Sequence, residues 1–161
     1  MGQYSIRVQK GYINFSSAHF ITYEGTRCEA LHGHNFTTSL RLDGTLDEND
    51  YVLDFVKTKK MLKKICDAID HKVLLPTDST KIRVEQRGDA VTADYDGRFY
   101  QFPAEDVVLL PIPNVTSEML ARYICGEMKS ALKAIGANNL SRIAVEVCES
   151  PGQGATYTED F

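Results

Sequence analysis

The sequence predicts an α+β domain in which two helices pack on one face of an antiparallel sheet. Segments near both ends of the chain alternate between apolar and polar residues, as half-buried strands do. Two longer segments repeat apolar residues with the period of a helix. The expected order is two strands, a helix, a β excursion, then a second helix and two strands. A length of 161 residues suits one core, so we treat 1–161 as a single domain.

The first two expected strands cover residues 3–20 and 34–43, with a loop over 21–31 between them. The second strand alternates regularly and ends at the turn signal Asp43-Gly44. Its inward face would consist of Phe36, Thr38, Leu40 and Leu42. A later strand is expected over 141–148, where apolar residues again occupy every second position.

Two amphipathic segments predict the helices, one over 55–69 and one over 117–135. Asp54 is placed to cap the first helix, and Thr116 or Ser117 to cap the second. Between the helices, the stretch 80–103 holds three short strand patterns separated by Gly-Asp and Asp-Gly turns, which indicates a small β-meander.

Composition excludes several classes of function. The net charge is −4 and no basic stripe is present, which argues against a nucleic-acid-binding surface. No run of 18 apolar residues exists, so we expect no membrane span. The first residues lack the apolar stretch of a signal peptide, and we therefore expect a cytoplasmic protein. The four cysteines form no CxxC pair, which argues against a thiolate zinc knuckle.

The histidines carry the functional prediction. His32-Gly33-His34 begins an expected strand, where residues i and i+2 point to the same face. His19, on the preceding strand, can supply a third imidazole. Three histidines suit Zn²⁺ with a fourth position open for water or substrate, as in catalytic sites. The alternative is that these histidines only form hydrogen bonds.

Three further residues are candidates for proton transfer. Cys28 lies four residues before His32 and near the expected cation, which would favour its thiolate. It could instead be a fourth zinc ligand or an inert buried thiol. Asp70 directly precedes His71, and a carboxylate can orient an imidazole for proton transfer. The alternative for His71 is a favourable position at the end of a helix dipole.

An ordered set of motifs resembles the 6-pyruvoyl-tetrahydropterin synthase / 6-carboxy-5,6,7,8-tetrahydropterin synthase family. The resemblance runs from about residue 5 to Tyr157, apart from residues 77–112. Its motifs are Phe15-Ser16-Ser17-Ala18-His19, Cys28-x-x-x-His32-Gly33-His34, Val52-Leu53-Asp54-Phe55, Ile69-Asp70-His71, Asn114-x-Thr116-Ser117-Glu118, and Glu149 with Tyr157.

The resemblance implies a role for each matching residue. His19, His32 and His34 would be the zinc ligands. Cys28 would be the catalytic thiol, and Asp70 with His71 its partner dyad. The substrate-binding residues would be Glu149, Thr116 and Glu118. A carboxylate such as Glu149 can accept two N–H bonds from the 2-aminopyrimidinone edge of a pterin. From the residues alone, Glu149 could also be an exposed strand-end acid, and Glu118 a partner of a helix dipole.

The resemblance also implies the tunnelling fold, a four-stranded antiparallel sheet with two helices on one face. Subunits of this fold join as a homohexamer of two trimers, with active sites at subunit interfaces. The implied substrate is 7,8-dihydroneopterin triphosphate.

The spacing of three residues between Cys28 and the HGH motif resembles the carboxy-forming enzymes of queuosine and 7-deazaguanine biosynthesis. We therefore expect a zinc-dependent lyase that forms 6-carboxy-5,6,7,8-tetrahydropterin, acetaldehyde and triphosphate. The alternatives are a 6-pyruvoyl or hydroxymethyl product, or a non-catalytic zinc- and pterin-binding protein. A third branch of the family has Glu in place of the thiol; here Glu29 follows Cys28.

The chain departs from the family pattern in two places. Val115 stands where the family has proline, and residues 77–112 form an insertion that compact members lack. The insertion would decorate the edge of a trimer or reshape the pterin pocket.

Overall fold

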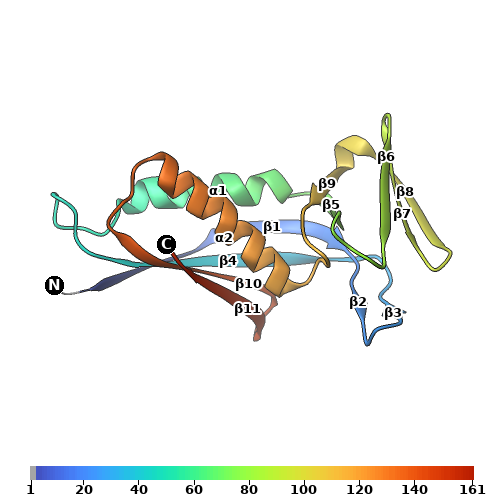
Figure 1. The fold of residues 1–161 in the computed structure, drawn as a ribbon, viewed down its shortest axis with the longest axis horizontal. Helices are drawn as coiled ribbons and strands as arrows, with labels where there is room; N and C mark the ends of the chain where they lie inside the picture. Colours follow the sequence, from blue (N-terminus) through green and yellow to red (C-terminus); the bar gives the residue numbers. More distant parts are fainter. Residues whose placement is uncertain (1–2) are drawn as a thin grey trace.

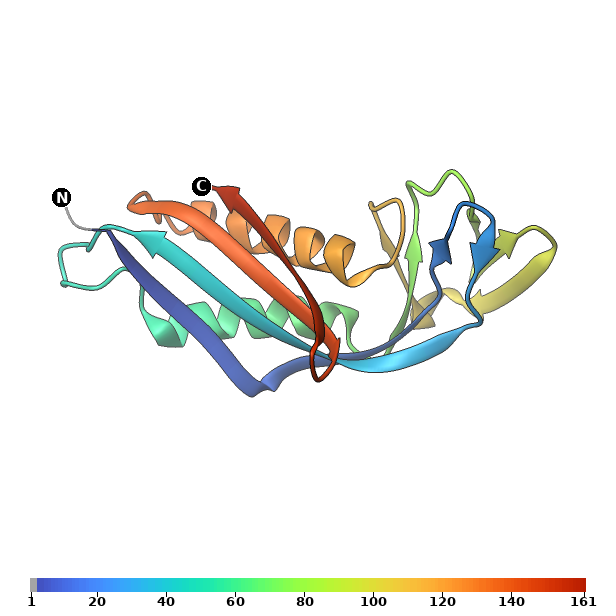
Figure 2. The same cartoon turned by 90° about the horizontal axis from the view of Figure 1, so that it is seen from below.

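The computed structural model describes residues 3–161, and its main sheet has six strands in the order β11-β10-β4-β1-β5-β9 (Figure 1). Helices α1 (Phe55–Ile69) and α2 (Ser117–Ala134) lie together on one face of this sheet (Figure 2). The sheet strands are β1 (Tyr4–His19), β4 (His32–Gly44), β5 (Lys72–Pro76), β9 (Val107–Leu110), β10 (Leu140–Ser150) and β11 (Gln153–Asp160).

Two smaller β units lie at the end of the molecule where β1 finishes and β4 starts (Figures 1 and 2). One is the short hairpin of β2 (Thr22–Tyr23) and β3 (Arg27–Cys28). The other is the expected antiparallel meander, which leads through a 3₁₀ turn at Ala104–Asp106 into β9. Its strands are β6 (Arg83–Arg87), β7 (Ala90–Tyr95) and β8 (Arg98–Pro103).

The predicted α+β class is confirmed, but the predicted four-stranded sheet is wrong in its number of strands. Strands β11, β10, β4 and β1 are antiparallel, and β5 and β9 extend them as parallel strands. Both added strands are short continuous apolar runs rather than alternating ones. The reason is burial on two sides: Leu74 packs in the main core, and its neighbour Leu75 packs in a second cluster beneath the meander.

The helices form where the sequence predicts them. Helix α1 has the predicted bounds, and the Asp54 carboxylate accepts a hydrogen bond from the Val56 N–H at its start. Helix α2 is capped by Thr116, whose hydroxyl accepts from the Met119 N–H, and it ends at Ala134, one residue early. Gly136 follows with φ of 74°, a conformation that stops a helix at little cost to glycine.

The main core fills the space between the helices and the sheet. Phe15 and Phe36 face each other across β1 and β4, with ring centroids 4.8 Å apart. Leu62 of α1 and Leu120 of α2 are fully buried over them. Cys66 and Cys125 are buried in these helices and act as small core residues.

The pairing of β1 with β4 changes register at a bulge. Four residues of β1, 10–13, lie between the pairs Gln9–Ser39 and Asn14–Thr37, which have a single residue between them on β4. Beyond the bulge the ladder continues to its end, where His19 lies opposite His32. Between the bulge and this end of the two strands, the ladder is therefore regular.

Within residues 3–161, neither helix combines the length and the apolar character that crossing a bilayer requires.

Replacement of Leu62 by alanine tests the core. Leu62 is completely buried, so Leu62→Ala should lower the free energy of unfolding by about 2–5 kcal/mol. Lys64→Ala, at an exposed position of the same helix, should change it by less than about 0.5 kcal/mol. Urea denaturation followed by circular dichroism measures both. Equal effects of the two substitutions would contradict the described packing of α1.

Candidate functional site

Three histidines converge where β1 ends and β4 begins. His19 and His32 are paired directly across the two strands, and His34 follows on the same face of β4. The ring centroids are 4.8 Å apart for His19 and His32, 5.4 Å for His19 and His34, and 4.9 Å for His32 and His34. One ligand nitrogen from each lies within 4.8 Å of the others, so the three can hold a metal ion.

Backbone carbonyls orient two of the rings. The Nδ1 atom of His19 lies 2.8 Å from the Val115 carbonyl oxygen, and that of His32 lies 2.8 Å from the Ala30 carbonyl oxygen. A carbonyl only accepts, so each Nδ1 carries the proton and each Nε2 presents a lone pair. Metal-binding histidines commonly donate their other ring N–H to a carbonyl in this way.

The Nε2 atom of His19 is buried and has no hydrogen-bond partner. Leaving a buried polar atom unpaired costs free energy, and a metal ion would satisfy this one. Burial also lowers the pKa of His19, which favours the neutral imidazole that a metal requires. The residues present therefore fit a metal with three imidazole ligands.

Gly33 lets β4 pass close to β1 between two of the ligands. A Cβ atom at this position would stand 3.1 Å from the Ser17 carbonyl oxygen and 3.7 Å from the Ala18 Cα. A larger residue would push the strands apart and move His32 and His34 with them. The glycine of the HGH motif thus keeps the ligand strands in contact.

One pocket joins the three histidines to the predicted substrate-binding residues. Glu149, at the end of β10, has its Oε2 atom 3.8 Å from the His34 Nε2. Thr116 and Glu118 enter from the start of α2. The lining residues are His19, Ile21, Glu29, His32, His34, Thr116, Ser117, Glu118, Glu149, Gln153, Gly154 and Ala155.

The segment before α2 is fastened to the metal-site loop. The Asn114 side chain donates to the Thr22 carbonyl at 2.8 Å and accepts from the Thr22 N–H at 3.2 Å. Val115, the residue that departs from the family's proline, is buried and offers His19 its carbonyl oxygen. A proline would offer the same carbonyl, which explains why valine is compatible with the site.

Cys28 and its neighbour Glu29 have different surroundings. The Cys28 thiol contacts the Glu29 carbonyl at 3.5 Å and packs against the cluster beneath the meander. Burial raises the pKa of the Cys28 thiol, although the nearby Arg98 opposes this. Glu29 lines the pocket instead, with its carboxylate Oε2 atom 3.7 Å from the His32 Nε2.

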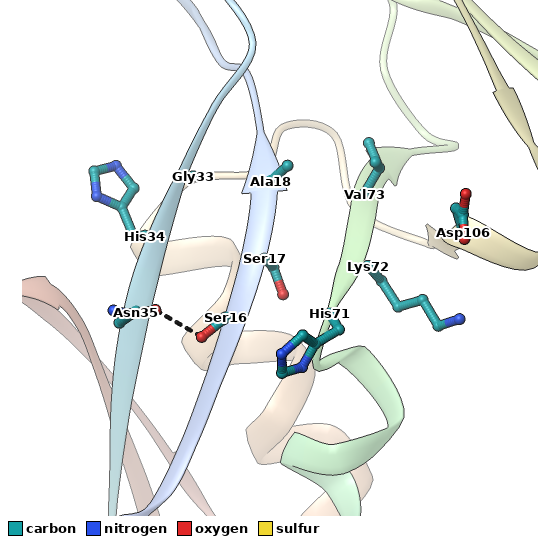
Figure 3. Close-up of a pocket in the computed structure, with 10 residues that line it drawn as sticks. All are labelled: Ser16, Ser17, Ala18, Gly33, His34, Asn35, His71, Lys72, Val73 and Asp106. Carbon is teal, nitrogen blue, oxygen red and sulfur yellow. Dashed lines mark hydrogen bonds between the residues drawn. The ribbon is translucent and has the colours of Figure 1, made fainter.

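Asp70 and His71 form a pair, as predicted, but outside the pocket of the three histidines. The His71 Nδ1 lies 3.0 Å from the Asp70 Oδ2, and the Ser16 N–H donates to the Asp70 Oδ1 at 2.7 Å. This N–H, then His71, hold the pKa of Asp70 below its ordinary value. The His71 side chain is 82% exposed and lines a second hollow beside β1. In Figure 3, strands β4 and β1 lie between the rings of His34 and His71.

The sequence assigns no site role to several pocket residues, among them Glu29 and Ser117. Glu29 stands out in the sequence only as the residue after Cys28, and strand alternation across this pair is the available signal that the two side chains diverge. Ser117 belongs to a family motif and is a possible cap, and its hydroxyl is buried and unpaired beside the pocket. Its position after the Thr116 cap, at the first residue of α2, leaves it free of the capping bond.

The chain is similar in sequence and in fold to several known proteins. Over 146 residues, the chain is 39% identical to a Methanocaldococcus jannaschii protein named putative 6-carboxy-5,6,7,8-tetrahydropterin synthase, covering 90% of this chain and 89% of that protein. Plasmodium vivax 6-pyruvoyltetrahydropterin synthase superimposes with a TM-score of 0.92 at 30% identity, over 100% of both chains. The Plasmodium falciparum synthase gives 0.88 at 31% identity, over 99% of both.

One of the P. vivax structures is described as a variant in which a catalytic glutamate is replaced by alanine. The sequence profile of the family described as 6-pyruvoyl tetrahydropterin synthase matches residues 8–160, nearly the full length of the chain. The chain therefore belongs to the 6-pyruvoyl tetrahydropterin synthase family.

Proposed function

We propose that the protein is a zinc-dependent lyase that converts 7,8-dihydroneopterin triphosphate and water to 6-carboxy-5,6,7,8-tetrahydropterin, with release of acetaldehyde and triphosphate. The observation that carries the proposal is one pocket lined by both the three-histidine cluster and Glu149. The similarity to the M. jannaschii protein supports the carboxy product. We assign the reaction to queuosine and 7-deazaguanine biosynthesis.

The metal in this proposal is Zn²⁺, held by His19, His32 and His34. Three neutral imidazoles and a position open to the pocket suit zinc in a catalytic role. Bound zinc would supply Lewis acidity toward a side-chain hydroxyl or carbonyl of the substrate, which makes the adjacent C–H more acidic.

The pterin ring would bind through Glu149. Its carboxylate can accept two parallel hydrogen bonds from the 2-aminopyrimidinone edge. Thr116 and Glu118 border the same space, and the unpaired hydroxyl of Ser117 offers a further polar contact. These contacts would hold the substrate side chain over the histidines.

Proton transfer at the substrate side chain would use the neighbouring residues Cys28 and Glu29. Glu29 is the residue of this pair that lines the pocket, which favours it as the base that removes the C1′ proton. The glutamate described as catalytic in the P. vivax synthase supports this role. Cys28 would assist as the second acid–base group, which requires its thiol to turn from the cluster it contacts.

The Asp70–His71 dyad would serve the pocket of a neighbouring subunit. The exposure of His71, and its place in a different hollow from the one that Glu29 lines, support this arrangement. We therefore propose a homohexamer of two trimers, in which subunits complete one another's sites.

Product analysis tests the reaction. Zinc-loaded protein incubated anaerobically with 7,8-dihydroneopterin triphosphate should form 6-carboxy-5,6,7,8-tetrahydropterin and acetaldehyde, measured by mass spectrometry. A 6-pyruvoyl product, which the Plasmodium structures favour as the alternative, would keep the site and change the pathway. A zinc-loaded protein without turnover would contradict the proposal and favour a binding role.

The histidine cluster can be tested by its affinity for metal. His19→Ala should weaken zinc binding by more than about a hundredfold, because it removes a ligand rather than a group that only orients a ligand. His71→Ala removes the remaining histidine of the chain and should leave affinity unchanged. Competition with a chromogenic chelator measures both. Equal losses in the two variants would contradict the assigned ligands.

The two candidate acid–base residues can be separated by substitution. Glu29→Gln should lower kcat by about 10²–10⁴-fold with zinc retained, because a positioned base contributes that much. Cys28→Ala should lower kcat by less, since the thiol packs away from the pocket. Steady-state kinetics measures kcat of both variants, and zinc analysis shows whether each retains the metal. Full turnover of Cys28→Ala would exclude this thiol from proton transfer.

Subunit mixing tests where the dyad acts. Glu29→Gln and His71→Ala should each be nearly inactive alone. Hybrids from co-expression should regain about a quarter of the activity. In about a quarter of randomly formed shared sites, an intact Glu29 comes from a His71→Ala chain and an intact His71 from a Glu29→Gln chain. Hybrids purified through two different affinity tags provide the material. If each chain completes its own site, the hybrids will stay inactive.

A further inference from the structure

One arginine of the inserted meander donates two hydrogen bonds to the loop that carries Cys28 and Glu29. Arg98 begins β8, directly after the turn at Asp96 and Gly97. Its Nη1 atom donates to the Cys28 carbonyl at 3.1 Å and to the Glu29 carbonyl at 2.7 Å. Hydrogen bonds from a guanidinium are charge-assisted and directional, so they fix the orientation of both peptide groups.

The residues next to the metal ligands pack against the same insertion. Phe20, which follows His19, is buried with its ring centroid 5.2 Å from that of Tyr100 on β8. Leu31, which precedes His32, and Cys28 pack against this second cluster. The cluster is separate from the main core, so the meander forms a support of its own beneath the loop.

Apart from the two hydrogen bonds between Asn114 and Thr22, the loop has few other fixed contacts. Strands β2 and β3 pair over only two residues each, and the Glu29 N–H donates to the Ile21 carbonyl at 3.0 Å. Two residues with positive φ, Glu24 and Gly25, form its tip. A hairpin this short is marginal without further packing. Contacts from the meander therefore support the loop at Cys28 and Glu29.

We propose that Arg98 is a positioning residue, which holds the backbone at Cys28 and Glu29 so that the Glu29 carboxylate faces His32 in the pocket. Arg98 acts through these two carbonyl groups and does not itself line the pocket. The insertion is thus part of the catalytic apparatus rather than an edge decoration. The expected effect of Arg98 on turnover rests on the proposed function, whereas its expected effect on the loop does not.

Amide hydrogen exchange on the full-length, zinc-loaded protein tests the structural part without any substrate. In Arg98→Ala, peptides that cover residues 22–31 should exchange at least about tenfold faster, because the opening free energy of a weakly supported loop falls. Peptides from α2 should be unchanged. Arg87→Ala is the matched control, since Arg87 lies on the same meander and its side chain pairs with Glu85, at 2.6 Å.

Kinetics of the same variants test the positioning role. Arg98→Ala should lower kcat by about tenfold or more with KM within twofold and zinc content unchanged, because small misplacement of a catalytic group is costly. Arg98→Lys keeps a cationic donor and should restore at least half of the activity.

Unchanged exchange of residues 22–31 in Arg98→Ala would overturn the inference, whatever the kinetics. Faster exchange with unchanged kcat would also overturn it, as would loss of zinc or a matching loss in Arg87→Ala. If the unaltered protein converts no substrate, the proposed function fails, and hydrogen exchange alone then decides whether Arg98 positions the loop.

Discussion

The register between β1 and β4 is the constraint on which the site depends. It sets His19 opposite His32 and puts both, with His34, on the face that the helices cover. A slip of one residue would turn the imidazoles to the other face, so the register cannot vary without losing the cluster. Phe15 and Phe36, stacked in the core along the same ladder, fix it by burial. The register of β1 and β4 thus sets both the core packing and the geometry of the three histidines.

Much of the site follows from local sequence patterns, and the rest depends on long-range contacts. The period of α1, the cap at Thr116 and the i, i+2 spacing of His32 and His34 are local, and the structure bears them out. The parallel pairing of β5 and β9 is not local, because their short apolar runs carry no alternation that identifies a strand or its partner.

Local sequence patterns also do not predict which of the side chains of Cys28 and Glu29 faces the pocket. Motif spacing draws attention to the thiol, but spacing says nothing about what lies on each side of the loop. The apolar cluster beneath the meander takes up Cys28, and the alternating neighbour Glu29 is left facing the histidines. Much of this cluster comes from the insertion, and a carbonyl contact from Arg98 could not be predicted from any local pattern.

The central claim is that one pocket joins a metal on three histidines to a pterin on Glu149. A crystal structure of the zinc-loaded protein with neopterin, with anomalous data at the zinc edge, tests it most directly. We predict one zinc peak between His19, His32 and His34, and the 2-amino edge of the pterin on the Glu149 carboxylate. A zinc peak away from these histidines, or a pterin that does not contact Glu149, would contradict the account.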